Sequence, residues 1–157
     1  MPKFKASLLA SITSFDFRTD TKIIYSDAFL GCTELESISI PSNIKSIGAM
    51  AFSGCTSLES VTLNNGLLYI GDSAFYGCTS LTELRVPNSV KQVDDHAFGS
   101  CSSLETLYLP GTIKEIGYDI CEDCDRVTIY CSAKTKPSAW RYDWNSYGCK
   151  VVWTYSG

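Results

Sequence analysis

Four cysteines near the C-terminus are the residues whose spacing comes closest to a metal site. Cys121 and Cys124 have C-x-x-C spacing, and Cys131 and Cys149 follow. Four thiolates match the ligand number of tetrahedral zinc. The second C-x-x-C pair that would make the pattern specific is missing, and Cys121 and Cys124 each have a place in the repeat described below. We therefore expect no metal.

The chain has a single histidine, His96, which is its only candidate general base near neutral pH. Nucleophilic catalysis also needs a serine or cysteine held against the base, and neither a nucleophile elbow nor a matching cysteine environment is visible. Phosphate-binding and dinucleotide-binding glycine loops, H-E-x-x-H and calcium loops are absent from the sequence too. We expect a non-enzymatic protein without cofactors, and His96 in an outward loop.

Charge and hydropathy exclude two further classes of partner. Thirteen Lys and Arg against 17 Asp and Glu give a net charge of -4, and the cations are scattered, so nucleic acid is not an expected partner. No apolar run approaches the roughly 20 residues that cross a bilayer. The N-terminus, Met-Pro-Lys-Phe-Lys followed by residues 6–12, resembles a weak secretory signal, but serine and threonine dilute its apolar part. The compartment stays open.

Several residue types recur every 23 positions, which is an internal repeat. Leucines mark one column, at Leu35, Leu58, Leu81 and Leu104. The two other columns are the pairs Ala28-Phe29, Ala51-Phe52, Ala74-Phe75 and Ala97-Phe98 and the cysteines Cys32, Cys55, Cys78, Cys101 and Cys124. Cys121 occupies the phenylalanine column, and Cys124 is the fifth repeated cysteine. A zinc role for either one therefore competes with a core role.

Each repeated leucine begins an L-x-x-L-x-L pattern, which predicts one strand per repeat. These strands should pair in parallel and in phase, and they span residues 35–40, 58–63, 81–86 and 104–109. A turn rich in Pro, Asn and Gly follows each strand, then a second apolar pair, then Ala-Phe-x-x-Cys, which is long enough for one or two tight helical or 3-10 turns. Because one repeat cannot bury its own apolar edge, about six coils should stack into a solenoid.

The N-terminal segment also has a place in this stack. Subtracting 23 from the first clear repeat gives Ile12, Phe15 and Phe17, which are all apolar. Residues 1–20 are therefore predicted to be a degenerate first coil, within a solenoid over residues 1–130. This core role competes with the secretory-signal interpretation.

Together these columns form the pattern I-x-x-I-G-x-x-A-F-x-x-C-x-S-L-x-x-V-x-I-P, carried for example by residues 70–81. The pattern resembles the BspA-type branch of the leucine-rich repeats over about residues 21 to 130. The ending, from Ile129 through Trp153, is also similar to the terminal segment of bacterial members. The resemblance implies a leucine-rich-repeat solenoid and a non-catalytic role in adhesion or in binding host proteins at a cell surface.

Residues 131–157 are expected to cap the C-terminal end of the stack. Phase is lost after Cys124, which predicts that the solenoid ends there. A short helix could begin at Pro137 and carry Trp140 and Trp144 on one face, with a strand at 149–153. These tryptophans could instead stack on a sugar. Cys131 and Cys149 could form a disulfide in an oxidising compartment, while the repeated cysteines should be buried and reduced.

Strand alternation sends one set of side chains outward onto a concave sheet, where a partner would bind. The set is Ser37, Ser39, Ser60, Thr62, Glu83, Arg85, Thr106 and Tyr108. Glu83, Arg85, Thr106 and Tyr108 are the predicted partner-binding residues, because long and aromatic side chains anchor interfaces more often than small hydroxyls do. A merely solvated sheet remains an alternative.

Two functional classes follow from this surface and from the ends of the stack. The first is a protein-binding or adhesion module that uses the concave face, and the second is an assembly subunit that joins neighbours through the solenoid ends. A column of Glu36, Glu59 and Glu105 and another of Lys45, Lys91 and Lys114 are interpreted as solvated charge ladders.

Overall fold

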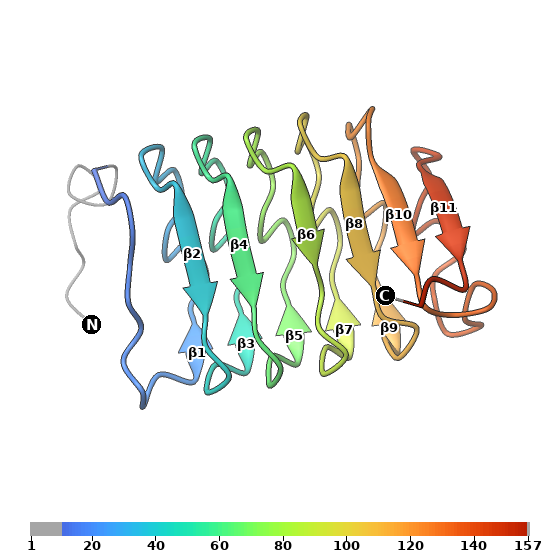
Figure 1. The fold of residues 1–157 in the computed structure, drawn as a ribbon, viewed down its shortest axis with the longest axis horizontal. Helices are drawn as coiled ribbons and strands as arrows, with labels where there is room; N and C mark the ends of the chain where they lie inside the picture. Colours follow the sequence, from blue (N-terminus) through green and yellow to red (C-terminus); the bar gives the residue numbers. More distant parts are fainter. Residues whose placement is uncertain (1–10, 157) are drawn as a thin grey trace.

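The computed structural model describes residues 11–156 as a stack of coils with a longer strand on one face and a two-residue strand on the other (Figure 1). The longer strands form what we call the long-strand face: β2 (Ser37–Ile40), β4 (Ser60–Leu63), β6 (Glu83–Arg85), β8 (Thr106–Leu109), β10 (Thr128–Cys131) and β11 (Lys150–Trp153). The opposite, short-strand face contains β1 (Ile23–Ile24), β3 (Ser46–Ile47), β5 (Tyr69–Ile70), β7 (Gln92–Val93) and β9 (Glu115–Ile116).

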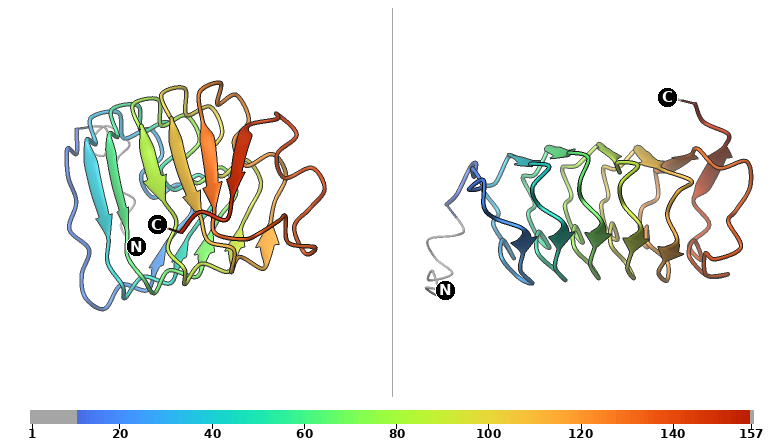
Figure 2. Two further views of the ribbon diagram at one scale, coloured as in Figure 1. Left: turned by 45° about the vertical axis from the view of Figure 1, so that its right-hand side comes forward. Right: turned by 90° about the horizontal axis from the view of Figure 1, so that it is seen from below.

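The strands pair in parallel and in the phase of the repeat, as predicted. Ser37 pairs with Ser60, and Glu83 pairs with Thr106, each 23 residues later. On the short-strand face β1, β3, β5, β7 and β9 follow one another in a single five-stranded sheet. Figure 2 shows the two faces as the two sides of one continuous stack. The expected solenoid is therefore confirmed in the described residues.

The long-strand face is interrupted between β4 and β6. Strands β2 and β4 form one sheet, and β6, β8, β10 and β11 form another. Val61 of β4 is half-buried, whereas Ile38 and Leu84, its counterparts in β2 and β6, are buried. The short-strand sheet has no such break, because β5 pairs with β7. The strand pairing is thus continuous on one face and interrupted on the other, although β4 and β6 remain neighbours.

The core consists of columns of identical residue types stacked from coil to coil. Phe29, Phe52, Phe75 and Phe98 stack with ring centroids 5.0, 5.2 and 6.2 Å apart, and the buried Cys121 takes the next place, as the repeat predicted. Beside them the repeated cysteines are buried, and those from Cys55 onward each donate to a phenylalanine carbonyl of the preceding coil, for example Cys78 Sγ to Phe52 O at 3.3 Å. Burial raises the pKa of the Cys55 thiol. Their reduced state stays a prediction.

The expectation of short helical turns is wrong, since the described residues contain only strands and tight turns. Left-handed residues explain this: Met50 has φ 54° and Gly54 has φ 72°, and the same two positions are left-handed in the other repeats. Two left-handed residues four apart prevent a helical turn. The backbone donors also bond to the next coil instead, as Phe52 N does to Ala74 O at 2.8 Å.

The described part of the first coil stacks in phase with the others. Glu36 N donates to Thr13 O, which repeats the bond of Glu59 N to Glu36 O one coil later. Ile12 and Phe17 are half-buried against the core, while Phe15 is 42% exposed. The core role of this segment is therefore partly confirmed. The secretory-signal alternative falls largely on residues 1–10, which lie outside the described residues.

The C-terminal segment continues the stack, contrary to the expectation that it ends near residue 130. Strand β10 pairs with β8 and β11 pairs with β10, so Ile129 lies between Leu107 and Val151. These partners are 22 residues apart instead of 23, and this change of period explains the apparent loss of phase. In place of the expected helix, residues 137–148 form a series of turns.

The tryptophans cover the last coils as a cap should. Trp140 and Trp144 are 2% and 4% exposed, with ring centroids 5.0 Å apart. Trp140 Nε1 donates to Ile113 O at 2.9 Å, so the ring is fixed against the preceding coil. Neither ring is accessible to a sugar, which argues against the stacking alternative for this pair.

The register of the last two strands also excludes a bridge between Cys131 and Cys149. Cys131 pairs with Trp153, whereas Cys149 directly precedes Lys150 at the start of β11. Four residues of strand separate the two cysteines by about 13 Å along the sheet, and a disulfide needs Cα atoms within about 7 Å. Among residues 11–156, no His, Cys, Asp or Glu side chains gather as a metal-ligand set, and no helix is long and apolar enough to cross a membrane.

Candidate protein-binding surface

Outward-facing side chains of the long-strand face change in character from the N-terminal to the C-terminal coils. In β2, Ser37 and Ser39 are exposed between buried isoleucines. In β6, Glu83 and Arg85 are exposed on either side of the buried Leu84. The predicted alternation is thus confirmed, and the long polar side chains begin where the sheet is interrupted.

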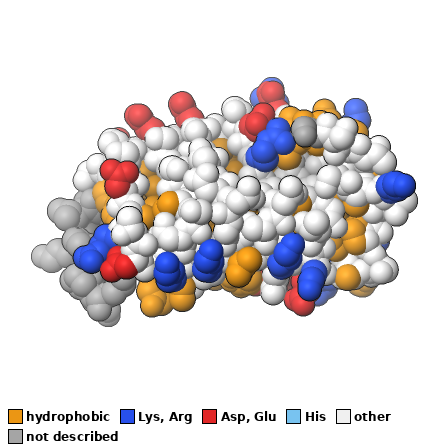
Figure 3. Space-filling view, turned by 60° about the horizontal axis from the view of Figure 1, so that its bottom comes forward, with side chains coloured by type: hydrophobic (Ala, Val, Ile, Leu, Met, Phe, Trp, Pro, Cys, Tyr) orange, Lys and Arg blue, Asp and Glu red, His pale blue; other side chains and the backbone are white. Residues whose placement is uncertain are grey.

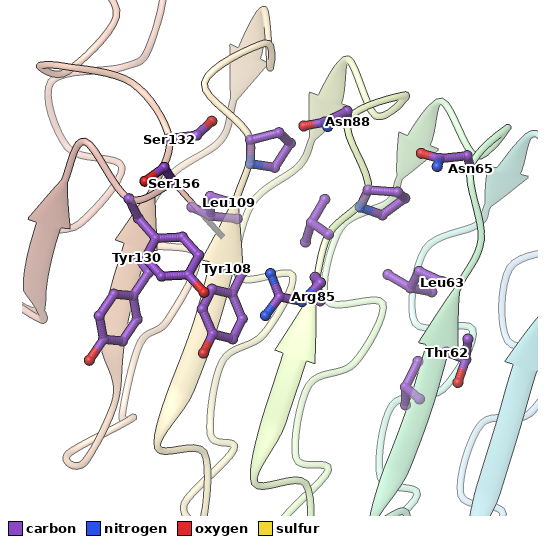
Figure 4. Close-up of a pocket in the computed structure, with 15 residues that line it drawn as sticks. Thr62, Leu63, Asn65, Arg85, Asn88, Tyr108, Leu109, Tyr130, Ser132 and Ser156 are labelled. Carbon is purple, nitrogen blue, oxygen red and sulfur yellow. The ribbon is translucent and has the colours of Figure 1, made fainter.

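A groove of about 590 Å³ crosses the C-terminal half of this face (Figure 4). It spans the interruption between β4 and β6 and continues along the ends of β8 and β10 to the C-terminal tail. Its lining combines aromatic, aliphatic and neutral polar side chains with one arginine. Among these residues are Leu63, Asn65, Arg85, Pro87, Asn88, Tyr108, Pro110, Tyr130, Ser132 and Tyr155. A concave site of mixed apolar and polar lining is the usual form of a ligand-binding surface.

Arg85 supplies the positive charge of the groove. Its Cζ lies 3.7 Å from the centroid of the Tyr108 ring, a cation–π contact that fixes the guanidinium over the ring. Among residues 11–156 the arginines in ion pairs are Arg18, Arg126 and Arg141. The N–H groups of Arg85 are therefore free to meet a carboxylate of a ligand.

Three tyrosines form an aromatic cluster next to Arg85. Tyr108 stacks with Tyr130 at 5.4 Å, and Tyr155 contacts both rings at 5.0 and 5.4 Å. The tail is held there because Tyr155 N donates to Cys131 O at 3.0 Å. Desolvation, followed by the nearby Tyr155 and Glu83, raises the pKa of Tyr108.

The structure separates the four predicted site residues into two groups. Arg85 and Tyr108 line the groove together. Glu83 and Thr106, which pair with each other at the start of their strands, lie outside it. Sequence reasoning missed Tyr130 and Tyr155. Tyr130 follows Tyr108 by 22 residues, so the change of period hid it from a search at 23.

His96 is less exposed than the sequence suggested. It is half-buried in a left-handed turn with φ 51°. Its Nδ1 lies 3.1 Å from Glu122 Oε2, and its ring meets Tyr118 edge-on at 5.2 Å. None of these three residues lines the groove. His96 therefore lies in a turn, and its side chain packs against the next coil.

The repeat columns match one known family. A profile described as the BspA type leucine rich repeat region matches six copies over residues 4–135. The chain belongs to the BspA-type leucine-rich repeat family. No curated protein matches this BspA-type chain.

Solved leucine-rich-repeat structures have a similar fold. A leucine rich repeat protein from T. pallidum is 36% identical with a TM-score of 0.68, over 69% of this chain and 51% of its own. A leucine rich cell surface protein from Faecalibacterium prausnitzii is 28% identical with a TM-score of 0.72, over 94% of this chain and 36% of its own. The pneumococcal vaccine antigen PcpA, 20% identical with a TM-score of 0.71, covers 90% of this chain and 41% of its own and shows the fold alone. This BspA-type chain thus spans about half or less of each of these structures.

Proposed function

We propose that this chain is a non-catalytic module that binds a protein partner through the groove of the long-strand face. The observation that carries the proposal is the arrangement of Arg85 over Tyr108, with Tyr130 and Tyr155 beside it. Arginine and tyrosine are enriched among the few residues that dominate binding energy. Tyrosine adds large contact area at a low cost in conformational entropy.

The shape and chemistry of the groove suit an extended segment of a partner that carries an acidic residue. Arg85 would meet the carboxylate, and the tyrosine cluster would cover an apolar or aromatic neighbour. Asn65, Asn88 and Ser132 line the same groove and can bond to the backbone of such a segment. The F. prausnitzii relative is described as a cell surface protein, which is consistent with a module that meets its protein partner at a cell surface.

The test is selection of peptides from a random display library on the unmodified protein. Peptides that bind should be enriched in Asp or Glu next to aromatic or apolar residues. Arg85→Ala and Tyr108→Ala should each weaken binding at least tenfold, because each removes a central anchor. Ser37→Ala with Ser39→Ala is the matched control on the N-terminal half of the same face and should leave binding unchanged. Equal loss in the control, or peptides that bind elsewhere, would overturn the proposal.

A second candidate function, assembly through the solenoid ends, is supported by apolar side chains on the first described coil. Ile23, Tyr25 and Leu30 are 45%, 58% and 45% exposed. Among the described residues, β1 pairs with β3 alone, so its other edge is open to a further strand. Light scattering tests this role: the parent should form higher-mass species with rising concentration, and Ile23→Lys should abolish them. A parent that stays monomeric contradicts it.

A further inference from the structure

A row of lysines lies along the turn edge, where each long strand is followed by a short one. The lysine row consists of Lys22, Lys45, Lys91 and Lys114, with Leu68 at its centre. These residues are joined directly from coil to coil: Lys45 N donates to Lys22 O at 2.7 Å, Leu68 N to Lys45 O at 2.8 Å, Lys91 N to Leu68 O at 2.9 Å and Lys114 N to Lys91 O at 2.8 Å. Neighbouring positions are therefore about 4.8 Å apart, and the row spans about 19 Å.

No lysine of this row forms a close ion pair. The arginines in ion pairs within residues 11–156 are Arg18, Arg126 and Arg141, and an acidic side chain that acts on the row is Asp20, whose pKa is lowered by Arg18 and, to a lesser extent, by Lys22. Lys45 Nζ and Lys91 Nζ instead donate to the backbone carbonyls of Ser42 and Asn88 in the adjoining turns, at 3.1 and 3.2 Å. Figure 3 shows Lys and Arg side chains in a line across this edge.

Acidic residues collect at the opposite edge of the molecule. Glu36, Glu59 and Glu105 directly precede β2, β4 and β8, so they lie where the long strands begin, and the lysine row follows the ends of these strands (Figure 1). The four segments 41–45, 64–68, 87–91 and 110–114 contain no Asp or Glu and are rich in Asn, Ser and Thr, whereas the segment that ends at Lys22 contains Asp20, which pairs with Arg18. A protein of net charge -4 thus keeps one edge cationic and lined with neutral hydrogen-bonding groups.

We propose that the lysine row binds a linear polyanionic glycan laid along the solenoid axis. Lysines repeated at the spacing of the coils, with one gap at Leu68, match a chain of repeated sulfates or carboxylates, and the neighbouring amides and hydroxyls can bond to sugar hydroxyls. Proteins that bind single-stranded nucleic acid add aromatic platforms for stacking, whereas the only non-lysine in the row is the aliphatic Leu68. None of the lysines lines the groove, although Asn65 and Asn88 of the adjoining segments do, so the charge of the row acts independently of the proposed protein-binding residues Arg85 and Tyr108.

The experiment measures binding of heparin fragments of graded length by calorimetry at several salt concentrations. Lys45→Gln with Lys91→Gln should weaken binding tenfold or more and should lower the slope of log affinity against log salt by about 1.4, that is about 0.7 for each lost contact. The matched control is Lys134→Gln with Lys150→Gln. It removes the same charge from exposed lysines outside the row and should stay within twofold of the parent.

A gain-of-function variant tests the geometry of the row. Leu68 is 46% exposed, so Leu68→Lys should fold normally and complete a row of five cations. Affinity for heparin fragments should rise several-fold and the salt slope should steepen. An unchanged affinity would mean that the alignment of the lysines is not what binds, and would overturn the proposal.

The remaining outcomes of the experiment concern binding of other polyanions and self-association of the protein. Hyaluronan fragments carry carboxylates without sulfates, so their binding relative to heparin tells which anion the row prefers, and row-dependent binding of either supports the proposal. Equal binding of single-stranded DNA, equal loss in the control pair, or no heparin binding at low salt would contradict it. Light scattering addresses a second copy as the occupant: self-association that the row variant abolishes, without glycan binding, would assign the row to the glutamate edge of another molecule.

Discussion

The N-terminal and C-terminal coils share one scaffold but present different side chains on the long-strand face. From β2 to β8 the strand partners are 23 residues apart, and β2 presents only the small hydroxyls of Ser37 and Ser39. From β8 onward the partners are 22 apart, and the face carries Tyr108 and Tyr130. Regular columns build the stack, and the departures from regularity create the groove.

The two ends differ in a similar way. On the first described coil Phe15 is 42% exposed and Ile23 is 45% exposed. At the other end Trp140 and Trp144 are buried against the last coils, and β11 covers the edge of β10. Because every coil is supported mainly by its neighbours, the covered end should contribute far more to stability than the open one.

The largest expected effect is loss of the covered end. Deleting residues 137–157 removes β11 and three tryptophans, and exposes the edge of β10. Loss should spread inward from coil to coil, so we expect aggregation or a broad melting transition. Thermal unfolding and size-exclusion chromatography measure it. A truncated chain that stays monomeric with the melting temperature of the parent would show that the segment is not a cap.

Next in size is a break in the phenylalanine stack. Phe75 is fully buried between Phe52 and Phe98, so Phe75→Ala should lower the free energy of unfolding by about 3 to 5 kcal/mol. The same change at Phe15, on the open end, should cost less than about 1 kcal/mol. Denaturant titration of both variants checks the contrast. Similar losses at the two positions would remove the distinction between a continuous core and an open end.

A smaller effect is expected at Gly71, one of the positions where the backbones of neighbouring coils approach closely. A Cβ at Gly71 would lie 2.8 Å from Ala49 N and from Gly48 C, which are backbone atoms that cannot move aside cheaply. Gly71→Ala should therefore cost about 1 to 3 kcal/mol. Ser37→Ala on the exposed face of β2 is the control and should change stability by about 0.5 kcal/mol or less. Equal stability of Gly71→Ala and the parent would mean that the coils can separate at this point.

The smallest effect should come from the residue that looked most catalytic. His96→Ala removes one partly exposed contact with Glu122, and even a charged pair at such a site contributes only about 0 to 1 kcal/mol. Met50→Ala, in the same left-handed position two coils earlier, separates the backbone effect from the contact with Glu122. Chemical denaturation compares them, and peptide binding in the groove should be unchanged in both. Loss of peptide binding in His96→Ala alone would tie His96 to the function.

Much of the fold could be predicted because the information lies in spacing. Leu35 and Phe29 recur in columns, and a column implies parallel stacking in register. The helical turns were wrongly predicted because propensity does not show that Met50 and His96 adopt left-handed conformations. Tyr155 was missed as a groove residue for a different reason. Its position depends on how the tail folds back over β10, and no periodic signal encodes that.

The interruption between β4 and β6 leaves two sheets side by side on the long-strand face, with no strand pairing across the junction. On the opposite face β5 and β7 are hydrogen-bonded, so the backbone sheet that joins the two halves of the molecule lies on the side away from the groove. The groove spans the junction, with Leu63 on one side and Arg85 on the other. A partner segment that fills the groove would therefore connect two sheets that the protein's own strands leave unpaired, and we expect a bound partner to hold the two halves of the solenoid together.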